Sequence, residues 1–133
     1  MRIRITFVLT VLAVFVLWSV LDVILHVAIL GPVYQASSEL WRAPEAMKPL
    51  YIHAAVLLSA FVFTTIYTGF FSDKRPGNGL AYGFLWGAAN GVSKGFFTYA
   101  TTPVSFDLAV IWILGAIVEA ALAGLLLGYM IKE

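Results

Sequence analysis

The chain has 133 residues, of which 62% are hydrophobic and 11% are charged, and its formal net charge is +1. A chain with so few charged residues has too little polar surface to cover a soluble globule. The composition therefore indicates an integral membrane protein surrounded by the lipid bilayer. The small, scattered charge argues against a nucleic-acid partner, and the absence of cysteine excludes disulfides and cysteine nucleophiles.

Four apolar segments are long enough to cross a bilayer, which takes about 20 mostly apolar residues in a helix. They cover residues 5–30, 50–71, 80–101 and 106–131. Short connections with Pro76 and Pro103 separate the last three segments, so consecutive helices should pack antiparallel. We therefore expect an all-α integral membrane fold, an antiparallel four-transmembrane-helix bundle formed by a single domain, residues 1–133.

The first segment follows Arg2 and Arg4, as the core of a signal peptide would. Its apolar stretch is well beyond the usual signal core of about 7 to 15 residues, and it carries Asp22 and His26. We expect this segment to be retained as a membrane helix.

Positive charges in the connections predict the orientation, because cytoplasmic loops carry an excess of Lys and Arg. Two such residues, Arg42 and Lys48, lie on the side opposite the termini. The others outside the spans are on the side of the termini, and they are Arg2, Arg4, Lys74, Arg75 and Lys132. Both termini are therefore expected in the cytoplasm.

The connection from Gly31 to Pro49 is longer than the others and contains serines and a tryptophan. Ser37 or Ser38 can cap a short helix, and Trp41 with Met47 can rest at the level of the lipid headgroups. We expect a short amphipathic segment on the outer face, over the first pair of helices.

The third segment has a glycine at every fourth position, and the last segment has small residues at the same spacing. Side chains four residues apart lie above one another on a helix, so each set forms a smooth stripe suited to close packing in lipid. This predicts a glycine-zipper third helix packed on the fourth, although such glycines can also leave room for a flat cofactor or a lipid tail. The two stripes are Gly79, Gly83, Gly87, Gly91 and Gly95, and Ala116, Ala120, Gly124 and Gly128.

Ionisable side chains within the spans are the main functional candidates, because a charge at the centre of a membrane helix costs about 2.5 to 3.5 kcal/mol. Asp22 and His26 share a helix face, and His53 is expected at a depth similar to that of His26. We predict a polar pocket in the outer half of the bundle, formed by Asp22, His26, His53, Asn90, Lys94, Tyr99 and Asp107.

Glu119 is expected to lie apart from this pocket. It is about 20 Å along the last helix, past the midplane, where no histidine, lysine or arginine of the other spans is expected. Its carboxyl group is then protonated, or it meets a partner chain or water. This makes Glu119 a candidate proton or cation site, with a neutral structural carboxyl as the alternative.

The two histidines have two interpretations. They can form hydrogen bonds that tie the helix ends to the outer segment, or they can bind haem b or a divalent metal. A metal would need further ligands such as Asp22 or Glu39.

Lys94 and the tryptophans within the spans also have simple structural interpretations. Lys94 can extend to the membrane surface or pair with an acidic residue. Trp18, Trp86 and Trp112 are expected to face lipid or to pack between helices.

Several short motifs resemble those of a group of small bacterial inner-membrane proteins with four predicted helices and no known activity. The motifs cover residues 26–34, 40–42, 99–103, 112–115 and 123–128. The resemblance implies the same fold and a bacterial inner (plasma) membrane location, and it brings no catalytic residues.

No catalytic motif is present, so nothing supports an enzyme. We rank a structural or accessory subunit of a larger membrane complex first, with other membrane subunits or a homo-oligomer as partners. The second hypothesis is a small transporter or proton-linked carrier that uses Asp22, Lys94 and Glu119. The third is a haem- or metal-binding redox protein that uses His26 and His53.

Overall fold

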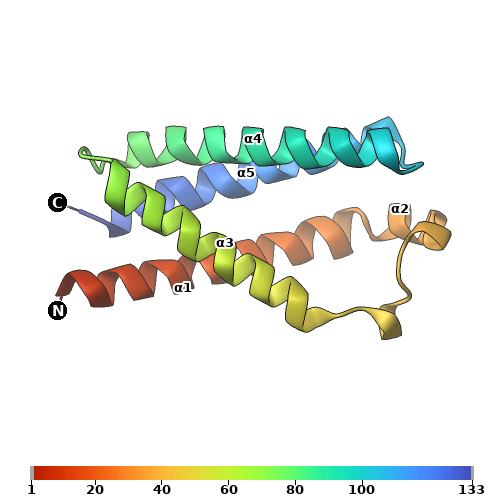
Figure 1. The fold of residues 1–133 in the computed structure, drawn as a ribbon, viewed down its shortest axis with the longest axis horizontal. Coiled ribbons are helices and arrows are strands. Elements are labelled where there is room, and N and C mark those ends of the chain that lie inside the picture. The colour runs from red at the N-terminus through yellow and green to blue at the C-terminus, as the bar shows by residue number, and fades with distance from the viewer. Residues whose placement is uncertain (1, 133) are drawn as a thin grey trace.

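The computed structural model describes residues 2–132, and within them it contains helices and no strands. Met1 and Glu133 of the predicted domain lie outside the described residues. The long helices are α1 (Arg2–Val23), α3 (Pro49–Phe70), α4 (Pro76–Thr101) and α5 (Phe106–Met130) (Figure 1). The shorter ones are a π-helix (Ile24–Ile29), α2 (Gly31–Ala36) and two 3-10 turns (Ser38–Leu40 and Pro44–Ala46).

Helix α1 passes directly into the π-helix, which ends shortly before Pro32. A proline has no N–H to donate to the preceding turn, so a regular helix cannot run through it unchanged. Instead, Leu30 N donates to Leu25 O at 2.8 Å, five residues back, and Pro32 lies in the first turn of α2. The predicted helix 5–30 is therefore an α-helix that ends in one wider turn.

Within residues 2–132, three helical stretches are long and apolar enough to cross a membrane, and they are Ile5–Ile29, Pro49–Phe70 and Phe106–Met130. The chain thus has the helices of a membrane protein. Helix α4 has the required length, but its sequence is less apolar, because it contains several glycines and also the polar residues Asn90 and Lys94. The predicted span 80–101, which corresponds to α4, is accordingly not among the three stretches found within residues 2–132.

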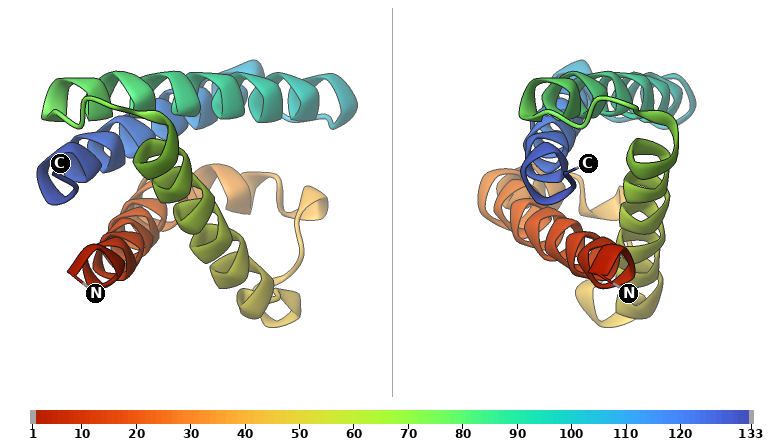
Figure 2. Two further views of the ribbon diagram at one scale, coloured as in Figure 1. Left: turned by 60° about the vertical axis from the view of Figure 1, so that its left-hand side comes forward. Right: turned by 90° about the vertical axis from the view of Figure 1, so that its left-hand side faces the viewer.

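The long helices leave one side of the molecule open. One end holds both chain termini and the α3–α4 connection, and we call it the terminal end; the opposite end, with α2 and the α4–α5 connection, is the α2 end. Helix α3 lies near α4 only at the terminal end and diverges from it toward the α2 end, as all views show (Figures 1 and 2). The antiparallel four-helix bundle expected from sequence is therefore not confirmed in full, because α3 diverges from α4 toward the α2 end.

Helices α4 and α5 make the closest contact in the structure. A Cβ atom added at Gly79 or Gly83 would collide with a carbonyl oxygen of α5, and at Gly87 it would lie 2.5 Å from the Ala116 oxygen. The contact continues to Gly95, which lies against Ala109 and Ile113. The two helices thus run antiparallel in contact along most of their length.

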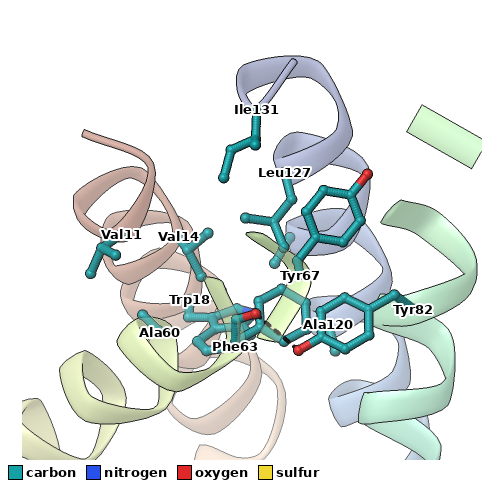
Figure 3. Close-up of a cluster of buried hydrophobic side chains, with 11 residues drawn as sticks. Val11, Val14, Trp18, Ala60, Phe63, Tyr67, Tyr82, Ala120, Leu127 and Ile131 are labelled. Carbon is teal, nitrogen blue, oxygen red and sulfur yellow. Dashed lines mark hydrogen bonds between the residues drawn. The ribbon is translucent and has the colours of Figure 1, made fainter. Parts of the chain in front are cut away.

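The larger cluster of buried apolar side chains, drawn in Figure 3, lies toward the terminal end, and a smaller one of Leu30, Val104 and Leu108 lies at the α2 end. Phe63 is fully buried between Trp18 and Tyr82, at ring-centroid distances of 5.1 and 4.6 Å. The Tyr82 hydroxyl donates to the Phe63 carbonyl at 2.9 Å, so its polar end is satisfied inside this core. The other half of the molecule is less filled, because α3 has turned away from it.

Candidate functional site

A cavity of about 1000 Å³ occupies the half of the molecule toward the α2 end. This is the upper end of the range for small-molecule sites, about 300 to 1,000 Å³. Its walls come from α1 and the π-helix, α2, the α2–α3 connection, α4 and α5, while α3 contributes Ser59. Most of its lining is apolar or aromatic.

Charged or titratable side chains from three parts of the fold line this cavity: Asp22 and His26 from α1 and its π-helical end, Lys94 from α4 and Glu119 from α5. Asp22 and Lys94 both act electrostatically on His26, and both act on Glu119 as well. The four groups therefore form one interacting cluster. Asn90 lines the same cavity, with its amide nitrogen donating to Trp86 O at 2.9 Å.

The position of Glu119 corrects the expectation from sequence, which placed it apart from every positive side chain. Trp18 Nε1 donates to the Glu119 carbonyl at 3.0 Å, so these two residues lie at the same level. Side chains on a helix lean toward its N-terminus, and α1 and α5 run in opposite directions. The carboxyl groups of Asp22 and Glu119 therefore lean toward each other, which residue counting along each helix does not capture.

Tyr34 of α2 closes the cavity at the α2 end through a short hydrogen-bond chain. Trp112 Nε1 donates to the Tyr34 hydroxyl at 2.8 Å, and that hydroxyl lies 2.7 Å from His26 Nδ1. Burial raises the pKa of Tyr34, an effect that the Trp112 hydrogen bond partly opposes, so the hydroxyl keeps its proton at neutral pH. Since Trp112 can only donate, the Tyr34 O–H is available to donate to His26.

His26 connects this chain to the acidic groups. With Nδ1 as acceptor, the proton of the neutral ring is on Nε2, which lies 4.0 Å from Asp22 Oδ1. His26 belongs to the π-helix, and such wide turns are frequent at functional sites. The Tyr34, His26 and Asp22 side chains thus form a continuous polar path from α2 toward Glu119.

Every tryptophan of the chain lines the cavity: Trp18, Trp41, Trp86 and Trp112. Three of the indole N–H groups are bonded within the protein, with Trp41 donating to Ser37 Oγ at 3.0 Å. Trp18, Trp86 and Trp112 were expected to face lipid or to pack between helices, and they do pack there: Trp18 belongs to the buried core, and Trp86 and Trp112 pack against buried clusters. Lining a cavity is a further role that the sequence did not predict.

Three residues of the predicted pocket lie elsewhere. His53 is exposed on the diverging half of α3, Tyr99 packs edge-on against Phe106 at 5.4 Å, and Asp107 is exposed in the first turn of α5. Within residues 2–132, no group of three His, Asp or Glu side chains could hold a metal ion. The metal interpretation, in which Asp22 or Glu39 completes a site with His26 and His53, therefore finds no such group of side chains among the described residues.

The residues that sequence reasoning missed are the cavity aromatics and Tyr34. A signal for the aromatics exists, because indoles recur at helical spacing from the polar residues. Trp18 precedes Asp22 by four positions, Trp86 precedes Asn90 by four, and Trp112 precedes Glu119 by seven. Tyr34 gave no such signal, because the π-helix separates it from α1.

Comparison with protein-family models, curated proteins and solved structures finds no match to the chain. The resemblance to small bacterial membrane proteins therefore gains no support from these comparisons.

Proposed function

We propose that the protein is a small proton-linked membrane carrier that binds its solute in the cavity and uses Asp22, Lys94 and Glu119 to couple binding to protonation. The observation that carries this proposal is the convergence of these side chains, from three helices, in one largely apolar cavity. Ionisable groups inside a membrane protein are costly and usually serve transport or proton transfer.

The acidic groups provide the chemistry for exchange. Two carboxylates side by side repel each other, and a proton or a positively charged group between them relieves that repulsion. Glu119 Oε1 is buried and accepts no hydrogen bond from the described residues. A solute in the cavity and a proton on this pair are thus alternative ways of satisfying the same groups.

The proposal includes a transmembrane α4. Because α4 contacts α5 along most of its length, a bilayer that contains α5 also surrounds α4. The molecule is then a four-helix membrane bundle with a glycine-zipper contact between α4 and α5. The excess of Lys and Arg near the termini favours a cytoplasmic location for both, and we retain the bacterial inner membrane as a proposal.

The accessory-subunit hypothesis loses one of its supports in this structure. Besides the small size of the chain, it drew on the small-residue stripes as packing faces, but the glycines from Gly79 to Gly95 are buried against α5 of the same chain. Other membrane subunits or a second copy would need another surface. The haem hypothesis is also weakened, because His53 does not line the cavity with His26.

Transport measurements in vesicles test the carrier proposal. The purified protein is reconstituted with the pH dye pyranine inside, and organic cations, organic anions and zwitterionic amino acids are added in turn. We expect at least one class to move protons faster than in protein-free vesicles. Glu119→Gln should lower that rate about tenfold or more, because the amide cannot exchange a proton.

The matched control is Glu45→Gln, which neutralises an exposed carboxyl group outside the cavity. This variant should retain the wild-type rate. The carrier proposal is wrong if no solute class moves protons, or if Glu119→Gln moves them at the wild-type rate.

A further inference from the structure

With both carboxyl groups ionised, the charged groups of the cavity carry one net negative charge, whereas a proton on either carboxyl group brings the net charge to zero. Asp22 and Glu119 contribute carboxyl groups, and Lys94 contributes the only ammonium group among the described lining residues. His26 is neutral when it accepts the Tyr34 hydrogen bond, and α3 adds only the uncharged Ser59. With both carboxyls ionised, the cavity therefore favours a cation over an anion.

The walls favour a cation of a particular kind. The electron-rich face of an indole attracts positive charge, and this attraction is strongest where water is excluded. All the indoles of the chain surround the same space, and Phe97 adds another ring. A large organic cation with apolar or aromatic groups can satisfy both the walls and the acidic pair, whereas a small hydrated ion satisfies only the pair.

The cavity opens sideways, between α3 and α4. Several lining residues of α4 are exposed even though they border the cavity, and so is Ser59 on α3. Those of α4 lie in the interior of the helix, away from its ends, and they are Ala89, Asn90, Ser93, Lys94 and Phe97. Helix α3 diverges from α4 on this same side (Figures 1 and 2). An apolar ligand can therefore reach the cavity from within the bilayer.

We propose that the cavity binds hydrophobic organic cations, which enter from the bilayer between α3 and α4 and place their positive centre at Asp22 and Glu119. The inference rests on the proposed carrier function, since it names the class of solute. It concerns binding at equilibrium, however, and so it can fail or succeed independently of transport.

A pair of probes with the same shape and opposite charge tests this inference. Tetraphenylphosphonium is the cation and tetraphenylborate is the anion, and binding of each to the detergent-purified full chain is measured by equilibrium dialysis against protein-free micelles. We expect saturable binding of the cation at one per chain, accompanied by a change in tryptophan emission, because every indole borders the site. The anion should show no saturable binding.

Two variants with opposite expected effects separate a binding role from a folding role. Glu119→Gln should weaken tetraphenylphosphonium binding about tenfold, whereas Lys94→Gln should strengthen it about threefold or more, because a like charge is removed. Loss of folding can only weaken binding, so the gain in Lys94→Gln is the diagnostic result. Glu45→Gln, outside the cavity, should bind the cation like the wild type.

The inference is overturned if tetraphenylborate binds as well as the cation, or if Lys94→Gln weakens cation binding. In either case the carrier proposal still stands on its own vesicle measurement, with another class of solute. Absence of saturable binding for both probes also overturns the inference.

Discussion

Tyr34 joins three parts of the molecule through a single hydroxyl group. It accepts from Trp112 of α5 at 2.8 Å and lies 2.7 Å from His26 of the π-helix. Tyr34→Phe leaves both partners without this bond, and since these bonds are exposed or only partly buried, each contributes about 0.5 to 1.5 kcal/mol. We expect this variant to lower the free energy of unfolding by the sum of the two contributions, measured by thermal unfolding in detergent with circular dichroism.

The control for this substitution is Tyr99→Phe, because Tyr99 is exposed and its hydroxyl makes no hydrogen bond within residues 2–132. It should unfold at the wild-type temperature. Equal unfolding of the Tyr34 and Tyr99 variants would show that the Tyr34 hydrogen bonds contribute nothing to stability.

For individual residues, the sequence predicts which side chains lie together on one helix better than it predicts which side chains of different helices come together. Asp22 and His26 follow from their spacing, and Asn90 and Lys94 from theirs. Glu119 could not be placed with them, since its position depends on how side chains lean in antiparallel helices. His53 was expected near His26 because the two have similar depths along their helices. Nothing in the sequence of α3 indicates that this helix diverges from the others.

The close contact between helices α4 and α5 can be tested by comparing two glycines, one inside the contact and one outside it. A Cβ atom at Gly83 would collide with the Ala120 carbonyl group of the backbone, whereas nothing lies within 4 Å of a Cβ atom at Gly69 of α3. Gly83→Ala should therefore destabilise the protein by about 1 to 3 kcal/mol or more through overpacking. Thermal unfolding in detergent measures the difference.

Gly69→Ala is the matched control, and it should be neutral or stabilise the protein by up to about 1 kcal/mol, since alanine favours the helix. A Gly83→Ala protein that is as stable as Gly69→Ala would contradict the close α4–α5 contact.

The extent of the helices themselves could be read from sequence, because long apolar runs and prolines mark their limits. Helix α4 begins earlier than the predicted residue 80, since Pro76 fits the first turn of a helix.

At the scale of the whole molecule, the splayed arrangement was not predictable from the sequence. Short connections determine that α4 and α5 are neighbours, but the connection from Gly31 to Pro49 is long enough to permit many positions of α3. The core fixes only the half of α3 that includes Phe63 and Tyr67. The cavity exists because the other half of α3 does not pack along α4. It is therefore a property of how the helices assemble, which no single helix sequence shows.

The arrangement of the ends predicts which connections lie on the same side of the membrane. The chain has no cysteine, so single cysteines can be introduced at Ser72, Lys132, Ala43 and Ser105 and labelled with a membrane-impermeant maleimide in intact and inverted vesicles. Because α4 runs antiparallel along α5, we expect Ser72→Cys and Lys132→Cys to react from one side and Ala43→Cys and Ser105→Cys from the other. Labelling of Ser72→Cys and Ser105→Cys from the same side would mean that α4 does not cross the bilayer. The cavity that α4 borders would then open to water, and an organic cation could no longer enter it from lipid.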